Sequence, residues 1–325
     1  MTTAASSRDT IVGGLIVVPV MAWMVYVATE GAGRWPWVGF VILAAAPFLL
    51  LFLPGVAGPL RATIAGHPGR ALAAMGLLAA YGMVLGTLTG TSRWYNILLW
   101  PVCIGCSALA AGTDDGTEIS PARLLLASFG IWILAGLWDP QLQVRTPGDL
   151  DLGLPYFAAL DLAMFLLLVV RPLRTFNPGL GLRGRDIATA LAAVAALFVV
   201  AVPVGYAVGF LHLSSRWNGL PYGAARLFGL ILFVGVPEEL LFRGMMQESF
   251  SRRFGLRAGW IAASVLFGLT HIVKHAPPLN WRYALLATLA GLAYGWVYRR
   301  TGKLAAAAIT HGLVDWIWST FLLVP

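Results

Sequence analysis

Three short clusters in the C-terminal third of the chain place ionisable side chains inside apolar runs. Their members are Glu238, Glu239, Arg243, Phe267, His271, His311 and Asp315. An ionised group at bilayer depth costs free energy and is rarely retained without a partner or a function. A carboxylate and two imidazoles brought together from separate helices can activate water, as hydrolysis requires. The three clusters therefore predict the functional site.

The first cluster follows a proline within one apolar run. Glu239 and Arg243 are four residues apart, which places them on one helix face with the acid N-terminal to the base, the favourable order. Glu238 is rotated from Glu239 by about 100° and can face a different wall. Pro237 cannot donate to the carbonyl of Phe233, so we expect the helix to loosen or kink just ahead of the carboxylates. We assign Glu239 and Arg243 to holding the helix and Glu238 to the chemistry.

The other two clusters have the same one-turn spacing. Phe267 can wall the site while His271 enters it, and Asp315 can orient His311 or share its target. A single intramembrane histidine or a single Glu–Arg pair is more often structural than catalytic. The occurrence of all three clusters on three of the last four apolar runs favours a catalytic site.

The composition predicts an all-α, polytopic transmembrane helix bundle. The chain has 325 residues, is 59% hydrophobic and 11% charged, and contains 13 tryptophans, unlike an ordinary soluble domain. Backbone groups must be satisfied internally in lipid, and no alternating pattern is present, so the spans are helices. About eleven runs reach spanning length. They are 11–29, 37–58, 71–90, 95–112, 123–138, 155–170, 187–211, 226–247, 258–274, 283–298 and 304–323.

Lysine and arginine are distributed unevenly between the loops. One side of the predicted membrane carries twice as many as the other, which places the N-terminus in the cytoplasm by the positive-inside rule. The net charge of +8 thus reflects topology, and we expect no nucleic-acid partner. The sequence predicts a multi-pass integral protein of a bacterial cell membrane. The first run, 11–29, lacks a cleavage pattern after it and predicts a retained helix.

An arginine-rich polar stretch at 171–186 is the best candidate boundary. We expect N-terminal transmembrane helices at 1–175 to act as a scaffold. A catalytic transmembrane bundle is expected at 185–325, with its motif core at 224–325.

At the three clusters the chain resembles the CPBP family of intramembrane proteases. This family includes the CAAX prenyl endopeptidases and the bacterial Abi-domain proteins linked to bacteriocin processing and immunity. The resemblance rests on the Glu-Glu-x-x-x-Arg, Phe-x-x-x-His and His-x-x-x-Asn/Asp motifs, in that order. It implies that Glu238 and His271 activate water, that His311 and the residue at position 315 stabilise the oxyanion, and that Glu239 and Arg243 support the site.

Position 315 departs from the CAAX enzymes, which are expected to have asparagine there. An amide can donate to an oxyanion, whereas the ionised Asp315 can only accept. If Asp315 contributes to an oxyanion hole, it must therefore be protonated or act through His311. The departure argues against a strict prenyl-CAAX assignment more than against proteolysis.

The family resemblance leaves the metal question open. Glu238, His271 and His311 form a set of the kind that binds catalytic Zn2+ with an open position, and Glu239 would then be the spare base. The His-Glu-x-x-His motif is absent. We favour a site without metal or other cofactor, with Zn2+ as the alternative.

The sequence thus predicts a membrane-embedded endopeptidase that hydrolyses a peptide bond in a membrane-associated or lipidated peptide. The first alternative is a proton-coupled transporter or channel, in which the same groups relay protons. The second is a non-catalytic immunity or scaffold protein of the same fold.

Overall fold

The computed structural model describes residues 54–65, 67–88, 143–145, 151–153, 181–272 and 279–323, with positions 47, 50, 51, 165, 169 and 170. The chain divides into two compact units, Met1–Arg174 and Thr175–Pro325. The predicted spans 11–29, 95–112 and 123–138 lie outside the described residues, and the spans 37–58 and 155–170 are described only in part.

The described part of the first unit contains two helices and one pair of short strands. Helices α3 (Pro54–Ile64) and α4 (Pro68–Leu88) contact each other, and each begins at a proline. Proline is favoured at the first helical position because the N–H it lacks would be unpaired there. Strands β1 (Gln143–Arg145) and β2 (Asp151–Gly153) pair antiparallel. This pair is a small addition to the all-α expectation.

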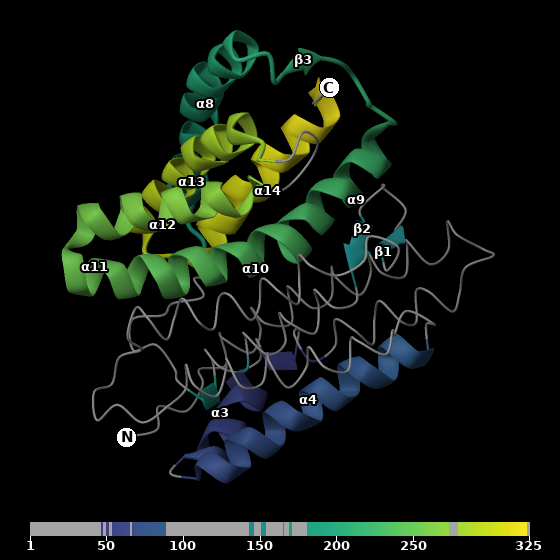
Figure 1. Ribbon diagram of the computed structural model, residues 1–325, viewed down its shortest axis with the longest axis vertical. Coiled ribbons are helices and arrows are strands. Elements are labelled where there is room, and N and C mark those ends of the chain that lie inside the picture. The colour runs from purple at the N-terminus through teal and green to yellow at the C-terminus, as the bar shows by residue number, and fades with distance from the viewer. Residues whose placement is uncertain are drawn as a thin grey trace. The chain divides into compact units, whose positions relative to one another are not determined.

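The second unit is a bundle of helices. It opens with α8 (Gly184–Ala207) and β3 (His212–Leu213). A long helical run follows, seen in Figure 1 from α9 to α11. Its parts are α9 (Leu220–Leu230), the π-helical segment η3 (Ile231–Gly235), α10 (Val236–Glu239), the π-helical segment η4 (Leu240–Gln247) and α11 (Glu248–Phe254). The unit continues with α12 (Leu256–Thr270), α13 (Trp281–Thr301), α14 (Leu304–Phe321) and β4 (Leu322–Leu323).

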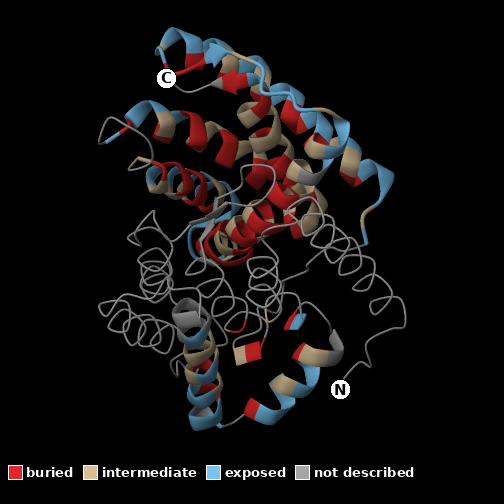
Figure 2. Cartoon of the chain, turned by 90° about the vertical axis from the view of Figure 1, so that its right-hand side faces the viewer, coloured by how far each residue is buried: buried red, intermediate tan, exposed pale blue. Residues whose placement is uncertain are grey.

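Helix α13 lies at the centre of this unit. It packs against α8, α12 and α14, and its buried face carries several alanines and glycines. Small residues let helices approach closely. Figure 2 shows the buried positions gathered in the interior of the C-terminal helices and the exposed positions along the outside.

Local signals set the helix ends. Asn280 caps α13 by accepting a hydrogen bond from the Tyr283 N–H at 3.2 Å. Gly302 ends α13 with a left-handed backbone (φ +66°), a conformation that glycine adopts without cost. At the start of α8, Asp186 accepts from the backbone of Arg183 and from Lys303, which joins α8 to the turn before α14.

The last two strands form a second short pairing. His212 lies opposite Leu323 and Leu213 opposite Leu322, so the segment after α8 pairs with the segment after α14. The pairing continues through the Arg216 N–H, which donates to the Thr320 carbonyl at 2.8 Å. These contacts connect the first and last helices of the unit at one end of the bundle.

Within the described residues, one helix is long and apolar enough to cross a bilayer, by length and composition alone. This helix is α8, and Gly69–Leu78 and Leu256–Thr270 are apolar but shorter. Leu191, Val199 and Val200 of α8 are exposed, as side chains that face lipid would be. The number of about eleven spans stays a prediction.

Candidate active site

Glu238 and Glu239 follow Pro237 and lie between two π-helical segments. The segment η3 ends two residues before Pro237, and η4 begins directly after Glu239. The loosening expected just ahead of the carboxylates is therefore present, in the form of π-helix. Such widened turns are frequent at functional sites because they change the direction of the side chains that follow.

Glu239 and Arg243 form a fully buried ion pair. Arg243 Nε lies 3.0 Å from Glu239 Oε2, and neither side chain is exposed. The N–H does not point at the oxygen in hydrogen-bond geometry, so the contact is electrostatic. Arg243 Nη2 donates to the Gly291 carbonyl at 2.8 Å, and the guanidinium lies 5.0 Å from the centre of the Phe267 ring. The pair expected from the spacing is thus anchored to α12 and α13 as well.

The second oxygen of Glu239 has a partner that the sequence did not indicate. His311 Nδ1 lies 2.8 Å from Glu239 Oε1, although the two residues are 72 positions apart. Because a carboxylate only accepts, Nδ1 carries the proton of this hydrogen bond. Glu239 therefore connects the arginine of its own helix to the histidine of α14.

The second ring nitrogen of His311, Nε2, lies near the other two carboxylates of the site. Nε2 lies 3.4 Å from Asp315 Oδ2 and 3.9 Å from Glu238 Oε2. The ring stacks on Tyr294 with centres 4.5 Å apart and planes 18° apart. Both ring nitrogens face acceptors, so His311 can serve both contacts only when it carries two protons.

His271 lies at the C-terminal cap of α12, whereas the sequence places it within a span ending at 274. Its Nδ1 lies 2.9 Å from the Phe267 carbonyl oxygen, to which Thr270 Oγ1 also donates at 2.7 Å. Both side chains thus contact the same carbonyl of the last turn, where the helix ends. A carbonyl only accepts, so Nδ1 carries the proton of this hydrogen bond, and in the neutral ring the lone pair is on Nε2.

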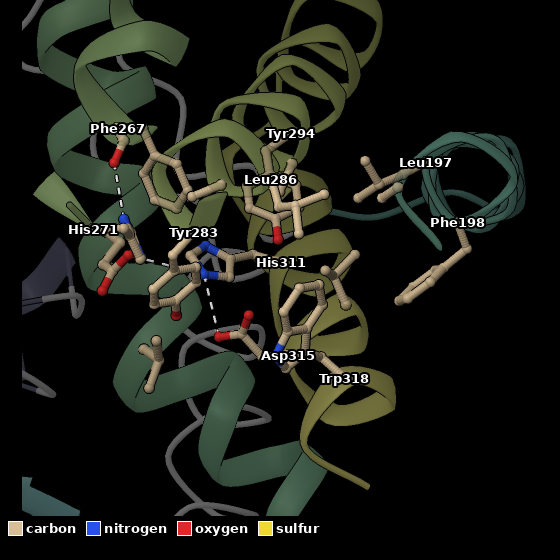
Figure 3. A pocket seen from close by; sticks show the side chains of 16 residues that line it. Leu197, Phe198, Phe267, His271, Tyr283, Leu286, Tyr294, His311, Asp315 and Trp318 are labelled. Carbon is tan, nitrogen blue, oxygen red and sulfur yellow. Dashed lines mark hydrogen bonds and ion pairs between the residues drawn. The ribbon is translucent and has the colours of Figure 1, made fainter. Parts of the chain in front are cut away.

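The catalytic candidates line one cavity of about 90 Å³ (Figure 3). Glu238, His271, His311 and Asp315 line it, together with Phe267 and apolar residues of α8, α13 and α14. This volume holds several water molecules. Glu239 and Arg243 do not line this cavity and are fully buried. The structure thus brings four ionisable residues from three helices to one water-sized space.

Two tyrosines of α13 belong to the site and were missed by reasoning from the sequence. Tyr283 and Tyr294 line the same cavity. They are eleven residues apart, or three helical turns, and so share one face. That spacing was the available signal, although it does not by itself distinguish a site from aromatic packing.

The alternative zinc ligands are Glu238, His271 and His311, and the metal question stays open. Among the residues that the structure describes, no group of three or more His, Cys, Asp or Glu side chains is arranged to hold a metal ion. Glu238, His271 and His311 line one cavity without forming such a group.

A family match covers the segment that carries all of these side chains. Residues 219–317 match the family described as type II CAAX prenyl endopeptidase Rce1-like. No curated protein and no solved structure matches the chain. Members of the matched family are integral membrane proteases, which are hydrolases with peptide substrates. Residues 219–317 are therefore similar to the Rce1-like CAAX prenyl endopeptidases, which is consistent with a protease of the CPBP family.

Proposed function

We propose that the chain is an intramembrane endopeptidase of the glutamate type, which hydrolyses a peptide bond in a membrane-associated or lipidated peptide. The observation that carries the proposal is the convergence of Glu238, His271, His311 and Asp315 on one cavity of about 90 Å³. This set supplies a general base, its partner and groups for a developing negative charge.

Glu238 and His271 activate the attacking water. The Glu238 side chain is 18% exposed and faces the cavity, and His271 lines the same cavity. As the water oxygen bonds to the carbonyl carbon, Glu238 takes one water proton. When the C–N bond breaks, that proton passes to the leaving nitrogen, which gives a carboxylic acid and an amine.

His311 meets the negative charge on the former carbonyl oxygen. Glu239 is hydrogen-bonded to Nδ1, so the Nε2 edge of the ring is directed at the cavity. When both ring nitrogens are protonated, the Nε2–H of the imidazolium can exchange its hydrogen bond to Asp315 for one to the oxyanion. Asp315 then acts through His311, as an acceptor that keeps the ring oriented before the substrate binds.

A comparison of membrane peptides from cells tests the proposal. Cells would express the wild type, Glu238→Ala or His271→Ala at matched protein levels. We expect new peptide ends with the wild type and none with Glu238→Ala or His271→Ala, because each of these substitutions removes a group that activates water. His212→Ala is the matched control, since His212 is exposed and lies outside the cavity.

Identical peptide ends from all variants would contradict the proposal. Proton flux into liposomes that requires Glu238 would then favour the transporter or channel. A phenotype that survives Glu238→Ala would favour the non-catalytic scaffold.

The metal question needs a separate measurement on purified active protein. We expect full activity after treatment with chelators and no stoichiometric zinc. Reversible loss of activity on chelation, together with one zinc per chain, would replace the glutamate mechanism with the metal alternative.

A further inference from the structure

Tyr294 has a buried, immobilised ring next to the proposed oxyanion site. Its exposed fraction is 1%, and its ring stacks on His311 at 4.5 Å. On other sides it contacts Phe267, with ring centres 5.8 Å apart, and the Arg243 guanidinium, 5.4 Å from its centre. These contacts from α12, η4 and α14 fix the direction of the phenol.

The hydroxyl of Tyr294 has no hydrogen-bond partner among the described residues. The hydroxyl is not among the fully enclosed polar atoms that lack a partner, so it opens on the cavity rather than on packed protein. Tyr294 lines the cavity, and Figure 3 shows its hydroxyl directed into it beside His311. Water in the cavity can satisfy the hydroxyl until a substrate replaces that water.

The site also lacks one donor. Two donors commonly meet the oxyanion of a tetrahedral intermediate, and here His311 supplies one. Asp315 lies beside His311 at the same cavity, but an ionised carboxylate cannot donate. A phenol can donate without losing its proton, and Tyr294 holds one at the same cavity.

We propose that the Tyr294 hydroxyl is the second oxyanion donor of this chain and replaces the donor that Asp315 cannot provide. The inference rests on the proposed peptidase function. The O–H stays on the tyrosine throughout, and only its hydrogen bond moves from water to the oxygen that gains charge. Because the ring is already fixed by its neighbours, the donor needs no reorganisation during the reaction.

Tyr294→Phe in the purified full chain, in detergent micelles, is the direct test. The probe is a fluorescence-quenched peptide built on the sequence whose new ends appear only with the wild type. We expect kcat to fall about 100-fold with KM unchanged, because an oxyanion donor acts only in the transition state. The phenylalanine ring retains the stacking on His311 and the contact with Arg243.

Tyr206→Phe is the matched control, because Tyr206 is 41% exposed and lies outside the cavity. Its kcat should equal that of the wild type. The midpoint of thermal unfolding of Tyr294→Phe should be no lower than that of the wild type, because the lost oxygen had no protein partner. An aldehyde analogue of the same peptide should inhibit Tyr294→Phe more weakly, since the hydrate that it forms by adding the activated water resembles the tetrahedral intermediate.

Two results separate the failure of this inference from the failure of the proposed function. If Glu238→Gln abolishes cleavage but Tyr294→Phe keeps the wild-type kcat, or changes only KM, the assignment of Tyr294 is overturned and the peptidase stands. If wild type and Glu238→Gln cleave the probe equally, both proposals are overturned.

Discussion

Glu238 and Glu239 are adjacent in sequence, yet they occupy different environments. The Glu238 side chain is 18% exposed and faces the cavity, whereas Glu239 is fully buried between Arg243 and His311. A turn of about 100° per residue separates them. One carboxylate can therefore exchange protons with water while the other compensates a buried cation.

Because the two environments differ, we expect replacement by glutamine to affect stability at one position and activity at the other. Glu239→Gln leaves the Arg243 guanidinium buried without a counter-charge and should lower the free energy of unfolding by about 3 kcal/mol. Glu238→Gln should leave that free energy near the wild-type value and abolish peptide cleavage. Chemical unfolding in mixed micelles and the cleavage assay measure the two effects. Equal stability of the two variants would contradict the structural role of Glu239.

The contacts of Glu239 show how far residue spacing can predict a site. A separation of four residues was sufficient to predict the pair with Arg243, because helix geometry fixes that distance. No local rule predicts the hydrogen bond to His311, 72 residues later, or the stacking of Tyr294 on that ring. Both depend on how three helices rotate against one another.

At the scale of elements, two glycines set the distance between η3 and α14. A Cβ added at Gly235 would lie 2.7 Å from the Ala308 carbonyl oxygen, and one added at Gly312 would lie 2.8 Å from the backbone nitrogen of Ile231. Real Cβ atoms do not approach so closely, so the backbones meet only because both positions are glycine. This crossing brings His311, next to Gly312, within reach of Glu239.

Gly312→Ala should therefore separate the two helices and impair the site. We expect overpacking of about 1–3 kcal/mol and a loss of cleavage, because the backbone of η3 cannot move aside as a side chain can. Gly184→Ala is the matched control, since a Cβ there meets nothing within 4 Å. Its unfolding midpoint and activity should stay near those of the wild type. Full activity of Gly312→Ala would contradict a site set by this crossing.

The elements themselves were only partly predictable. Apolar runs located the helices after residue 184, and Pro237 indicated the loosened turn ahead of the carboxylates. No residue pattern indicated that η4 follows them or that His271 caps α12. Apolar periodicity reports burial but does not separate a π-turn from an α-turn, and a histidine at a cap depends on its rotamer.

At the scale of the second unit, the direction of the helices separates the charges. Arg252 and Arg253 end α11, and Arg299 and Arg300 end α13, where cations also suit the helix dipole. Helices α12 and α14 begin next to these ends and run the opposite way. The basic side chains thus gather at one end of the bundle, which we expect to face the cytoplasm.

Labelling of single cysteines tests this orientation. In a Cys103→Ser, Cys106→Ser background, a membrane-impermeant maleimide applied to intact cells should label Ser215→Cys but not Phe254→Cys. Both positions are exposed, at opposite ends of the helices that connect them. Both should react once the membrane is opened, which controls for accessibility. The reverse pattern would place the basic end outside and contradict the positive-inside assignment.

A third cysteine, Ser7→Cys, extends this test to the number of spans. The predicted six spans before α8 form an even number, so the N-terminus should lie on the same side as the start of α8 and stay unlabelled in intact cells. If Ser7→Cys reacts while Phe254→Cys does not, an odd number of spans precedes α8, and one of the short runs at 95–112 or 123–138 does not cross. Because the orientation of the second unit is read independently from Ser215 and Phe254, that result would correct the span count without changing the orientation of that unit.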